Sequence, residues 1–149
     1  YIPEVILSGR KINDNIGFRH VDRLVKILEK KGLEVSNLEV LLLGFTFKEN
    51  CPDIRNTGVI NIINALRKLE IKFEVVDPLV NKEEAFNSYK LNIENNIPRN
   101  KKFSLIIVAV SHLMFTKFDI SVWKSLCKKE AIIFDLKGIV PRSLNPIRP

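Results

Sequence analysis

The chain has 149 residues, 46% of them hydrophobic and 28% charged, and these values fit one ordinary globular domain with its own core. No apolar run approaches the roughly 20 residues that cross a bilayer, which excludes a membrane span. The formal net charge of +7 raises the possibility of a polyanionic ligand. The basic residues are spread along the chain instead of clustering with aromatic residues, which favours a lysine-rich surface or a small phosphorylated ligand over nucleic acid.

The first segment predicts one long helix, roughly from Pro3 to Lys31, with Gly32 suited to its end. At about 1.5 Å per residue it would be on the order of 40 Å long, which is typical of a connector or an interface. Its apolar stripe consists of Ile12, Ile16, Val21, Leu24, Val25 and Leu28. Because the rest of the chain offers this stripe little partner surface, we expect residues 1–36 to pair with a second copy as a homodimer and residues 37–149 to form the following domain.

The remaining elements alternate between short apolar strands and helices. The predicted strands are 40–43, 73–76, 103–110 and 131–134, and the predicted helices are 59–69, 82–87 and one within 122–129. Residues 88–100 read as a loop with a minor strand near Leu91, and the proline-containing tail after Gly138 as loosely ordered. Unbroken apolar strands alternating with helices predict an α/β domain, Rossmann-like, with a doubly wound parallel sheet preceded by the long N-terminal helix.

Ligands of an open α/β sheet bind outside the carboxyl ends of the strands. This rule selects four places: the loop after Gly44, Asp77 with Pro78, Ser111 with His112, and Lys137 with Gly138. We therefore expect all four to lie along one edge of the sheet.

The loop GFTFKENCPDIRNT, residues 44–57, is about twice as long as an ordinary strand-to-helix loop. It holds Lys48 and Arg55, and Asn56 or Thr57 could cap the next helix, whose amino end favours anions. A lysine and an arginine at the mouth of a sheet suit a phosphate or carboxylate. The alternative is an irregular loop that carries surface charges.

This loop lacks the glycines with which a dinucleotide fold approaches a pyrophosphate, because no glycine follows Gly44 until Gly58. Asp77 could mimic the acidic residue that grips an NAD ribose, but a turn-forming Asp-Pro explains it better. We expect that NAD does not bind this domain in the standard way.

Several other residues allow a structural as well as a functional interpretation. His112 fits a structural histidine that caps a helix better than a ligand-binding one, and Trp123 fits the core. Arg10 and Asn13 could line either a dimer contact or the substrate side of the long helix. Cys51 and Cys127 lie far apart without metal-type spacing and, with no secretory signal at the start, indicate a reducing compartment, the cytoplasm.

The stretches VLLLGFTFKENCPDIRNT, EVVDP, LIIVAVSHLMF and IIFDLKG closely resemble the terminal domain of the UDP-glucose/GDP-mannose dehydrogenase family, in order and with sensible spacing. The opening YIPEVILSGRKINDN resembles the end of that family's central, dimer-forming helix. The resemblance implies an enzyme that oxidises the sixth carbon of a UDP-sugar to a carboxylate while reducing two NAD molecules. It also implies that the NAD-binding domain and the catalytic cysteine would precede Tyr1, because the family's cysteine lies just upstream of the central helix. Neither Cys51 nor Cys127 matches its position.

The resemblance also implies roles for four residues. Phe47, through its backbone, and Lys48, through its amine, match a pair that contacts the UDP-sugar. Arg55 matches an arginine that reaches towards NAD across the interdomain cleft. Lys137 matches a substrate-contacting basic residue that is arginine in several relatives, so a point charge replaces a two-pronged donor there.

These features lead to one main hypothesis and two alternatives. The sequences of the loop and of SGRKINDN resemble those of relatives that act on UDP-N-acetylhexosamines, including the Vi-polysaccharide type. We therefore expect this chain to be the UDP-sugar-binding portion of such a dehydrogenase, or of one that acts on UDP-glucose. We expect this portion to be inactive by itself. Such enzymes supply uronic acids to surface polysaccharides. The first alternative is a stand-alone nucleotide-binding or regulatory module, which would require a natural start near Tyr1. The second is a nucleic-acid-binding domain, which only the positive net charge suggests.

Overall fold

The computed structural model describes residues 4–149, with side chains described from Asn15 onward. The predicted roles of Arg10 and Asn13 therefore lie outside the described residues. Within 4–149, no helix combines the length and the apolar character that a bilayer crossing requires.

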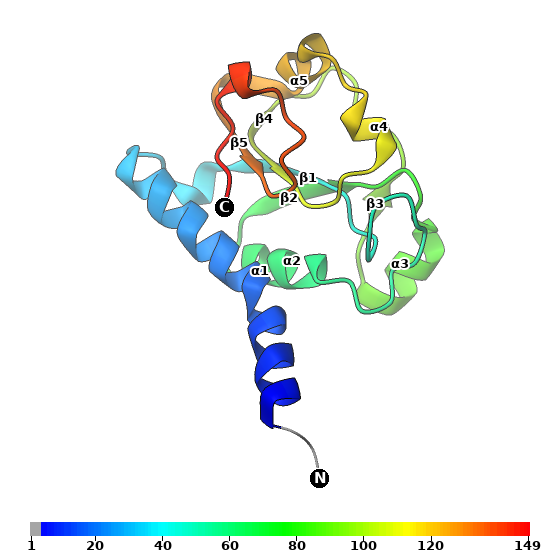
Figure 1. Cartoon of the computed structure of the whole chain (residues 1–149). Coiled ribbons are helices and arrows are strands. Elements are labelled where there is room, and N and C mark those ends of the chain that lie inside the picture. Colours follow the sequence, from blue (N-terminus) through cyan, green and yellow to red (C-terminus); the bar gives the residue numbers. More distant parts are fainter. Residues whose placement is uncertain (1–3) are drawn as a thin grey trace.

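A parallel sheet forms the centre of the molecule, in the strand order β3-β2-β1-β4-β5 (Figure 1). Its strands are β1 Glu39–Leu43, β2 Lys72–Val76, β3 Ile93–Glu94, β4 Phe103–Val108 and β5 Cys127–Asp135. Residues 40–43 of the central strand are fully buried on both faces, which explains their unbroken apolar run. The predicted parallel sheet is confirmed.

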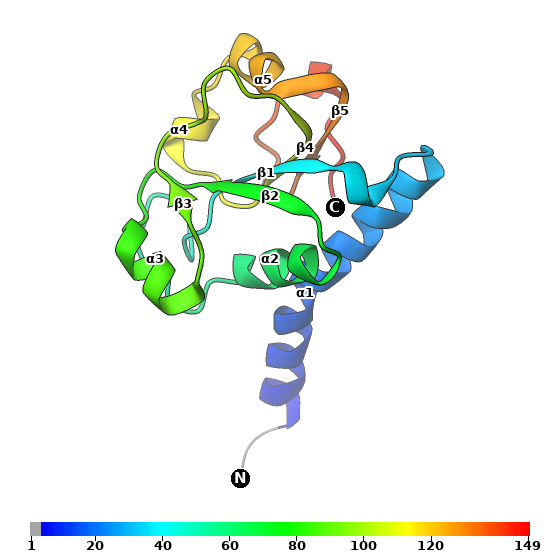
Figure 2. The same cartoon turned by 180° about the vertical axis from the view of Figure 1, so that it is seen from behind.

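Helices cover both faces of the sheet, as expected for a doubly wound fold (Figure 2). The first face carries α1 Glu4–Lys30, α2 Val59–Lys68 and α3 Lys82–Tyr89, and the second carries α4 Leu113–Thr116 and α5 Ile120–Leu126. Two 3₁₀ turns, Val35–Asn37 and Arg142–Leu144, complete the elements. Each face has its own apolar core, so the sheet separates two clusters of buried side chains.

The long helix α1 packs the later part of its apolar stripe, from Val21 to Leu28, within this chain. This corrects the expectation that the stripe has too little partner surface here. Val21, Leu24 and Leu28 are buried in the core of the first face. A Cβ on Gly17 would lie 2.8 Å from the Cβ of Asn61, so α1 can approach α2 this closely only because residue 17 has no side chain. The first turns of α1 project away from the sheet (Figure 1).

Three local predictions differ from the structure. Residues 127–129 begin strand β5 instead of ending a helix, because Cys127 pairs with Phe103 of β4. The register then shifts, and regular pairing resumes between Leu105 and Ile132. The single turn α4 was not predicted. The tail is ordered, since Ile147 bridges to Phe134 and Arg148 bonds to Asp135 and to the carbonyl of Val140.

Candidate functional site

A pocket of about 300 Å³ opens at the carboxyl ends of β1, β4 and β5, beside α1 and the start of α2. Its lining residues are Ile16, Gly17, His20, Thr46, Phe47, Lys48, Glu49, Gly58, Val59, Ile62, Ala109, Val110, Leu136 and Lys137. A larger groove of about 1100 Å³ runs along the 96–102 loop and α5, and none of the predicted site residues lines it. The smaller pocket therefore occupies the place that the sheet rule predicts for a ligand.

Three of the four predicted site residues meet in this pocket. Phe47 and Lys48 come from the loop after β1, and Lys137 comes from the loop after β5. Phe47 is 58% exposed, so its ring is presented at the surface instead of packing in the core. The lining contains the two lysines and one acidic residue, Glu49, which leaves a positive excess suited to an anion.

Arg55 is not among the residues that line the pocket. Its guanidinium makes a two-pronged contact with Asp53, at 3.0 Å from Nε and 2.9 Å from the terminal nitrogen, and its side chain is 81% exposed. Hydrogen bonds from the Arg55 side chain and backbone lower the pKa of Asp53 to about 2. Arg55 is therefore displayed on the outer side of the same loop.

Helix α1 contributes a pocket residue that the sequence reasoning missed, His20. Burial, and to a smaller degree the charge of Arg23, lower the pKa of His20, which favours the neutral imidazole. The signal was available, because His20 follows Ile16 by four residues and Gly17 by three and so shares their helix face.

The start of α2 also borders the pocket, at Gly58 and Val59. Gly58 is the N-cap residue, one position beyond the predicted Asn56 or Thr57. Thr57 still serves the helix start, since its hydroxyl accepts a bond from the amide of Val59 at 3.2 Å and donates to the carbonyl of Phe45 at 2.6 Å. A helix amino end directed at this place favours an anion.

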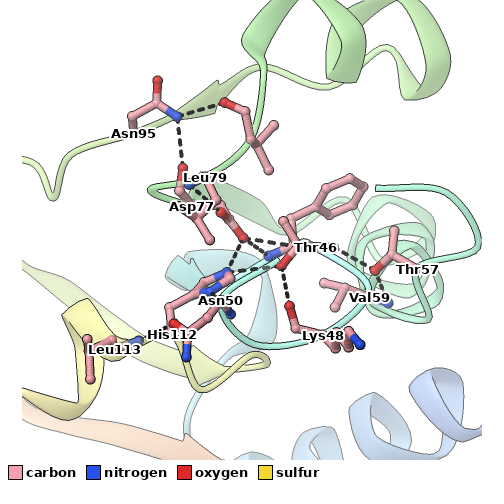
Figure 3. Close-up of polar contacts among 12 residues, drawn as sticks. Thr46, Lys48, Asn50, Thr57, Val59, Asp77, Leu79, Asn95, His112 and Leu113 are labelled. Carbon is pink, nitrogen blue, oxygen red and sulfur yellow. Dashed lines mark hydrogen bonds and ion pairs between the residues drawn. The ribbon is translucent and has the colours of Figure 1, made fainter. Parts of the chain in front are cut away.

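A buried polar network lies beneath the loop that carries Lys48 (Figure 3). One carboxylate oxygen of Asp77 accepts bonds from the amides of Phe45 at 2.7 Å and Thr46 at 3.1 Å, and from Nε2 of His112 at 2.7 Å. The other oxygen accepts from the amide of Leu79 at 2.9 Å. Asp77, Thr46 and His112 are buried, so three neighbouring strand ends share one internal network.

The bonding partners of His112 determine its tautomer. The amide of Asn50 donates to Nδ1 at 3.0 Å, so Nδ1 carries no hydrogen and Nε2 carries it. His112 precedes α4 as its N-cap residue but makes no side-chain capping bond. The predicted structural role and the place at the start of a helix are thus confirmed, but the side chain bonds to Asp77 and to the Asn50 amide instead of capping α4.

Asp77 bonds both to its own turn and to distant segments of the chain. Its bond to Leu79 confirms the predicted turn, but the bonds to Phe45, Thr46 and His112 were not predicted. Burial by itself raises the pKa of Asp77, but hydrogen bonds from His112 and from the three amides outweigh burial and lower the pKa overall. Because these donors occupy the carboxylate, Asp77 is not available to an NAD ribose, and the residues of this domain do not fit NAD in the standard mode.

The loop that carries Lys137 is held in a similar way. Asp135, the fully buried last residue of β5, accepts bonds from the amides of Lys137 at 3.2 Å, Gly138 at 2.8 Å and Val140 at 2.9 Å. Arg148 from the tail adds a contact at 3.3 Å. Both lysines of the pocket therefore stand on loops fixed by a buried aspartate.

Comparison with known proteins gives this geometry a context. Residues 41–142 match the model of the UDP-glucose/GDP-mannose dehydrogenase family, UDP binding domain. The chain is 38% identical over 148 residues to UDP-N-acetyl-D-glucosamine 6-dehydrogenase of Salmonella typhi, which covers 99% of this chain and 35% of that protein. It is 41% identical over 140 residues to Protein CapL of Staphylococcus aureus, which covers 93% of this chain and 32% of that protein.

A solved structure shows the same fold. NDP-N-acetyl-D-galactosaminuronic acid dehydrogenase from Methanosarcina mazei Go1 superposes with a TM-score of 0.81 and 21% identity, covering 99% of this chain and 31% of that one. The chain thus spans about a third of the length of the relatives that it matches.

Proposed function

The chain belongs to the UDP-glucose/GDP-mannose dehydrogenase family and holds its UDP-binding domain, and from this premise we propose that it is the substrate-binding portion of an NAD-dependent UDP-sugar 6-dehydrogenase. The observation that supports the proposal best is the pocket that brings Phe47, Lys48 and Lys137 together from loops about 90 residues apart in the sequence. In this reading the two ammonium groups neutralise the diphosphate.

We propose a UDP-N-acetylhexosamine as the substrate, oxidised at its sixth carbon to a uronic acid for a surface polysaccharide. The support is the name of the 38% identical relative from Salmonella typhi, which matches nearly this whole chain. A volume of about 300 Å³ is at the lower limit for a ligand pocket, so it suits part of a nucleotide sugar, with another part of the enzyme completing the site.

The chemistry itself is assigned to parts of the enzyme other than this chain. Cys127 is half-buried against the second core, and burial raises the pKa of its thiol, which disfavours the nucleophilic thiolate. We propose that this chain is inactive alone, that NAD and the catalytic cysteine belong to another domain, and that exposed Arg55 is directed towards that cofactor. The role of this chain is to bind and orient the sugar nucleotide.

The homodimer through α1 is part of the same proposal. Its support is now restricted to the first turns of α1, which project away from the sheet (Figure 1), because Val21, Leu24 and Leu28 pack within this chain.

Calorimetric titration of the chain with UDP tests the proposal. Lys48→Ala should weaken binding by about 1.5–3 kcal/mol, or roughly 10- to 150-fold, because it removes a charge-assisted bond to phosphate. Lys68→Ala is the matched control, since it removes the same exposed ammonium at the far end of α2, away from the pocket. Equal affinity of the Lys48→Ala and wild-type chains for UDP would refute the assigned role.

A further inference from the structure

The buried pair of His112 and Asp77 lies next to the pocket without lining it. His112 is 1% exposed and Asp77 is fully buried, so neither side chain is available to a ligand in the pocket. Burying a carboxylate is costly unless it is well bonded, and a loop of this kind could be held by neutral groups alone. The pair therefore calls for an explanation beyond turn formation.

The bonds of this pair converge on the backbone of residues 45–50. Asp77 accepts hydrogen bonds from the amides of Phe45 and Thr46, and His112 accepts one from the amide of Asn50. The hydroxyl of Thr46 donates to the carbonyl of Lys48 at 3.0 Å and lies 3.0 Å from Nε2 of His112, so it relays the network to the lysine itself. The loop is thus fixed at four backbone positions from beneath.

The side chains that the loop presents point the other way. Phe47 is 58% exposed and Lys48 is exposed, and both line the pocket. The amides bonded to the buried pair belong to residues on either side of them, Phe45, Thr46 and Asn50. Figure 3 shows Lys48 on the side of the loop away from Asp77. The binding surface and the residues that support it therefore lie on opposite sides of the loop.

Two further features show that this stretch is set in one conformation. Gly44 has a φ of +95°, and a Cβ there would lie 2.5 Å from the Cβ of Val110, so the ends of β1 and β4 approach as only glycine allows. Asn50 has a φ of 57°, and its side chain accepts a bond from the amide of Leu113 at 2.9 Å. Both ends of the stretch are therefore tied to the segment that carries His112.

We propose that His112 and Asp77 are positioning residues for the substrate loop: they hold the backbone of residues 45–50 so that Lys48 and the Phe47 backbone meet a nucleoside diphosphate, without touching it. The inference rests on the proposed function, because it names how that same site is kept ready. Groups that recognise phosphate lose affinity when their support is loosened, since the ordering must then occur on binding.

The test is calorimetric titration of the chain with UDP, at a temperature at which every variant is folded. His112→Ala should weaken UDP binding by about tenfold although it touches no ligand. His112→Asn keeps an acceptor for the Asn50 amide, and His112→Gln keeps a donor for Asp77, so each should recover part of the lost affinity. Phe103→Leu, a buried change at the opposite end of β4, is the control that lowers stability without altering UDP affinity.

Three results would overturn the inference: His112→Ala binding UDP as the wild type does, Phe103→Leu losing as much affinity, or the Asn and Gln variants recovering none. Amide hydrogen exchange at Asn50 gives a second measurement, which does not depend on UDP. His112→Asn should protect this amide better than His112→Gln, and equal protection would also refute the pair's role. A wild-type chain that fails to bind UDP would instead refute the proposed function, and the exchange measurement would still decide the role of His112.

Discussion

Each of the two lysine-bearing loops of the pocket is supported by a buried aspartate that directly follows or ends a strand. At the end of β2, Asp77 accepts four bonds, three from amides and one from a histidine. At the end of β5, Asp135 also accepts four bonds, three from amides and one from an arginine. Each carboxylate is fully buried.

The difference lies in what the two aspartates connect. The amides on Asp135 belong to the next five residues, so it stabilises its own turn, and its charge is compensated by Arg148. Two of the amides on Asp77 belong to a loop that begins more than 30 residues earlier, and its side-chain partner is a histidine bonded as the neutral form. Asp77 therefore joins the ends of three strands, and we expect its loss to lower the free energy of unfolding more than the loss of a contact within the Asp135 loop.

The largest effect is expected for Asp77→Ala. It leaves the buried amides of Phe45 and Thr46, and the partly buried amide of Leu79, without their acceptor. Breaking a buried polar network of this kind costs about 3–5 kcal/mol of unfolding free energy. Urea denaturation followed by circular dichroism measures it. Asp119→Ala is the control, since Asp119 also accepts a backbone amide but is exposed, and its loss should be clearly smaller. Equal losses would remove the distinction between the buried and exposed carboxylates.

A middle effect is expected for Arg148→Ala, which tests the Asp135 loop. The guanidinium is about one-third exposed and also bonds the carbonyl of Val140 at 2.7 Å, so we expect a loss of about 1–2 kcal/mol in unfolding free energy. Because the amides on Asp135 stay in place, UDP affinity should fall by less than about fivefold, below the effect of Lys48→Ala. Arg142→Ala, an exposed arginine nearby, should change neither quantity. A stability loss as large as that of Asp77→Ala would show that the tail supports more than its own loop.

This contrast also explains which parts the sequence could reveal. The parallel sheet was predicted because buried strands read as unbroken apolar runs, such as 40–43 and 105–108. Phe47, Lys48 and Lys137 were identified through a family resemblance and through their places at strand ends, and the sheet does bring them together. The turn at Asp77 was also predicted, because its bond to Leu79 spans only two residues.

The rest depended on contacts between distant segments. The bonds from Asp77 to residues 45 and 46, the acceptor role of His112 and the ordered tail all join residues far apart in the chain, and no local spacing encodes them. The start of β5 was misread because its Cys-Lys-Lys-Glu run carries the charges of a helix end, and only pairing with β4 makes it a strand.

The smallest effect is expected for Arg55→Ala, the exposed counterpart of the two buried pairs. The Asp53–Arg55 contact, at 2.9 Å, is only slightly longer than the His112–Asp77 contact, at 2.7 Å. Water screens the exposed contact and competes with it, so the urea midpoint should not change measurably. UDP affinity should also stay within about twofold, because Arg55 does not line the pocket.

The variant should still change one local quantity. Hydrogen bonds from Arg55 keep the pKa of Asp53 at about 2, so their removal should move it up towards the ordinary value of about 4, partly, since the backbone amide of residue 55 remains as a donor. Carboxyl resonances followed by NMR through an acid titration measure this. A loss of UDP affinity equal to that of Lys48→Ala would place Arg55 in the substrate site and contradict its proposed direction towards NAD. If the pKa of Asp53 rises while the urea midpoint and the UDP affinity stay unchanged, a short ionic contact stabilises this loop only where water is excluded.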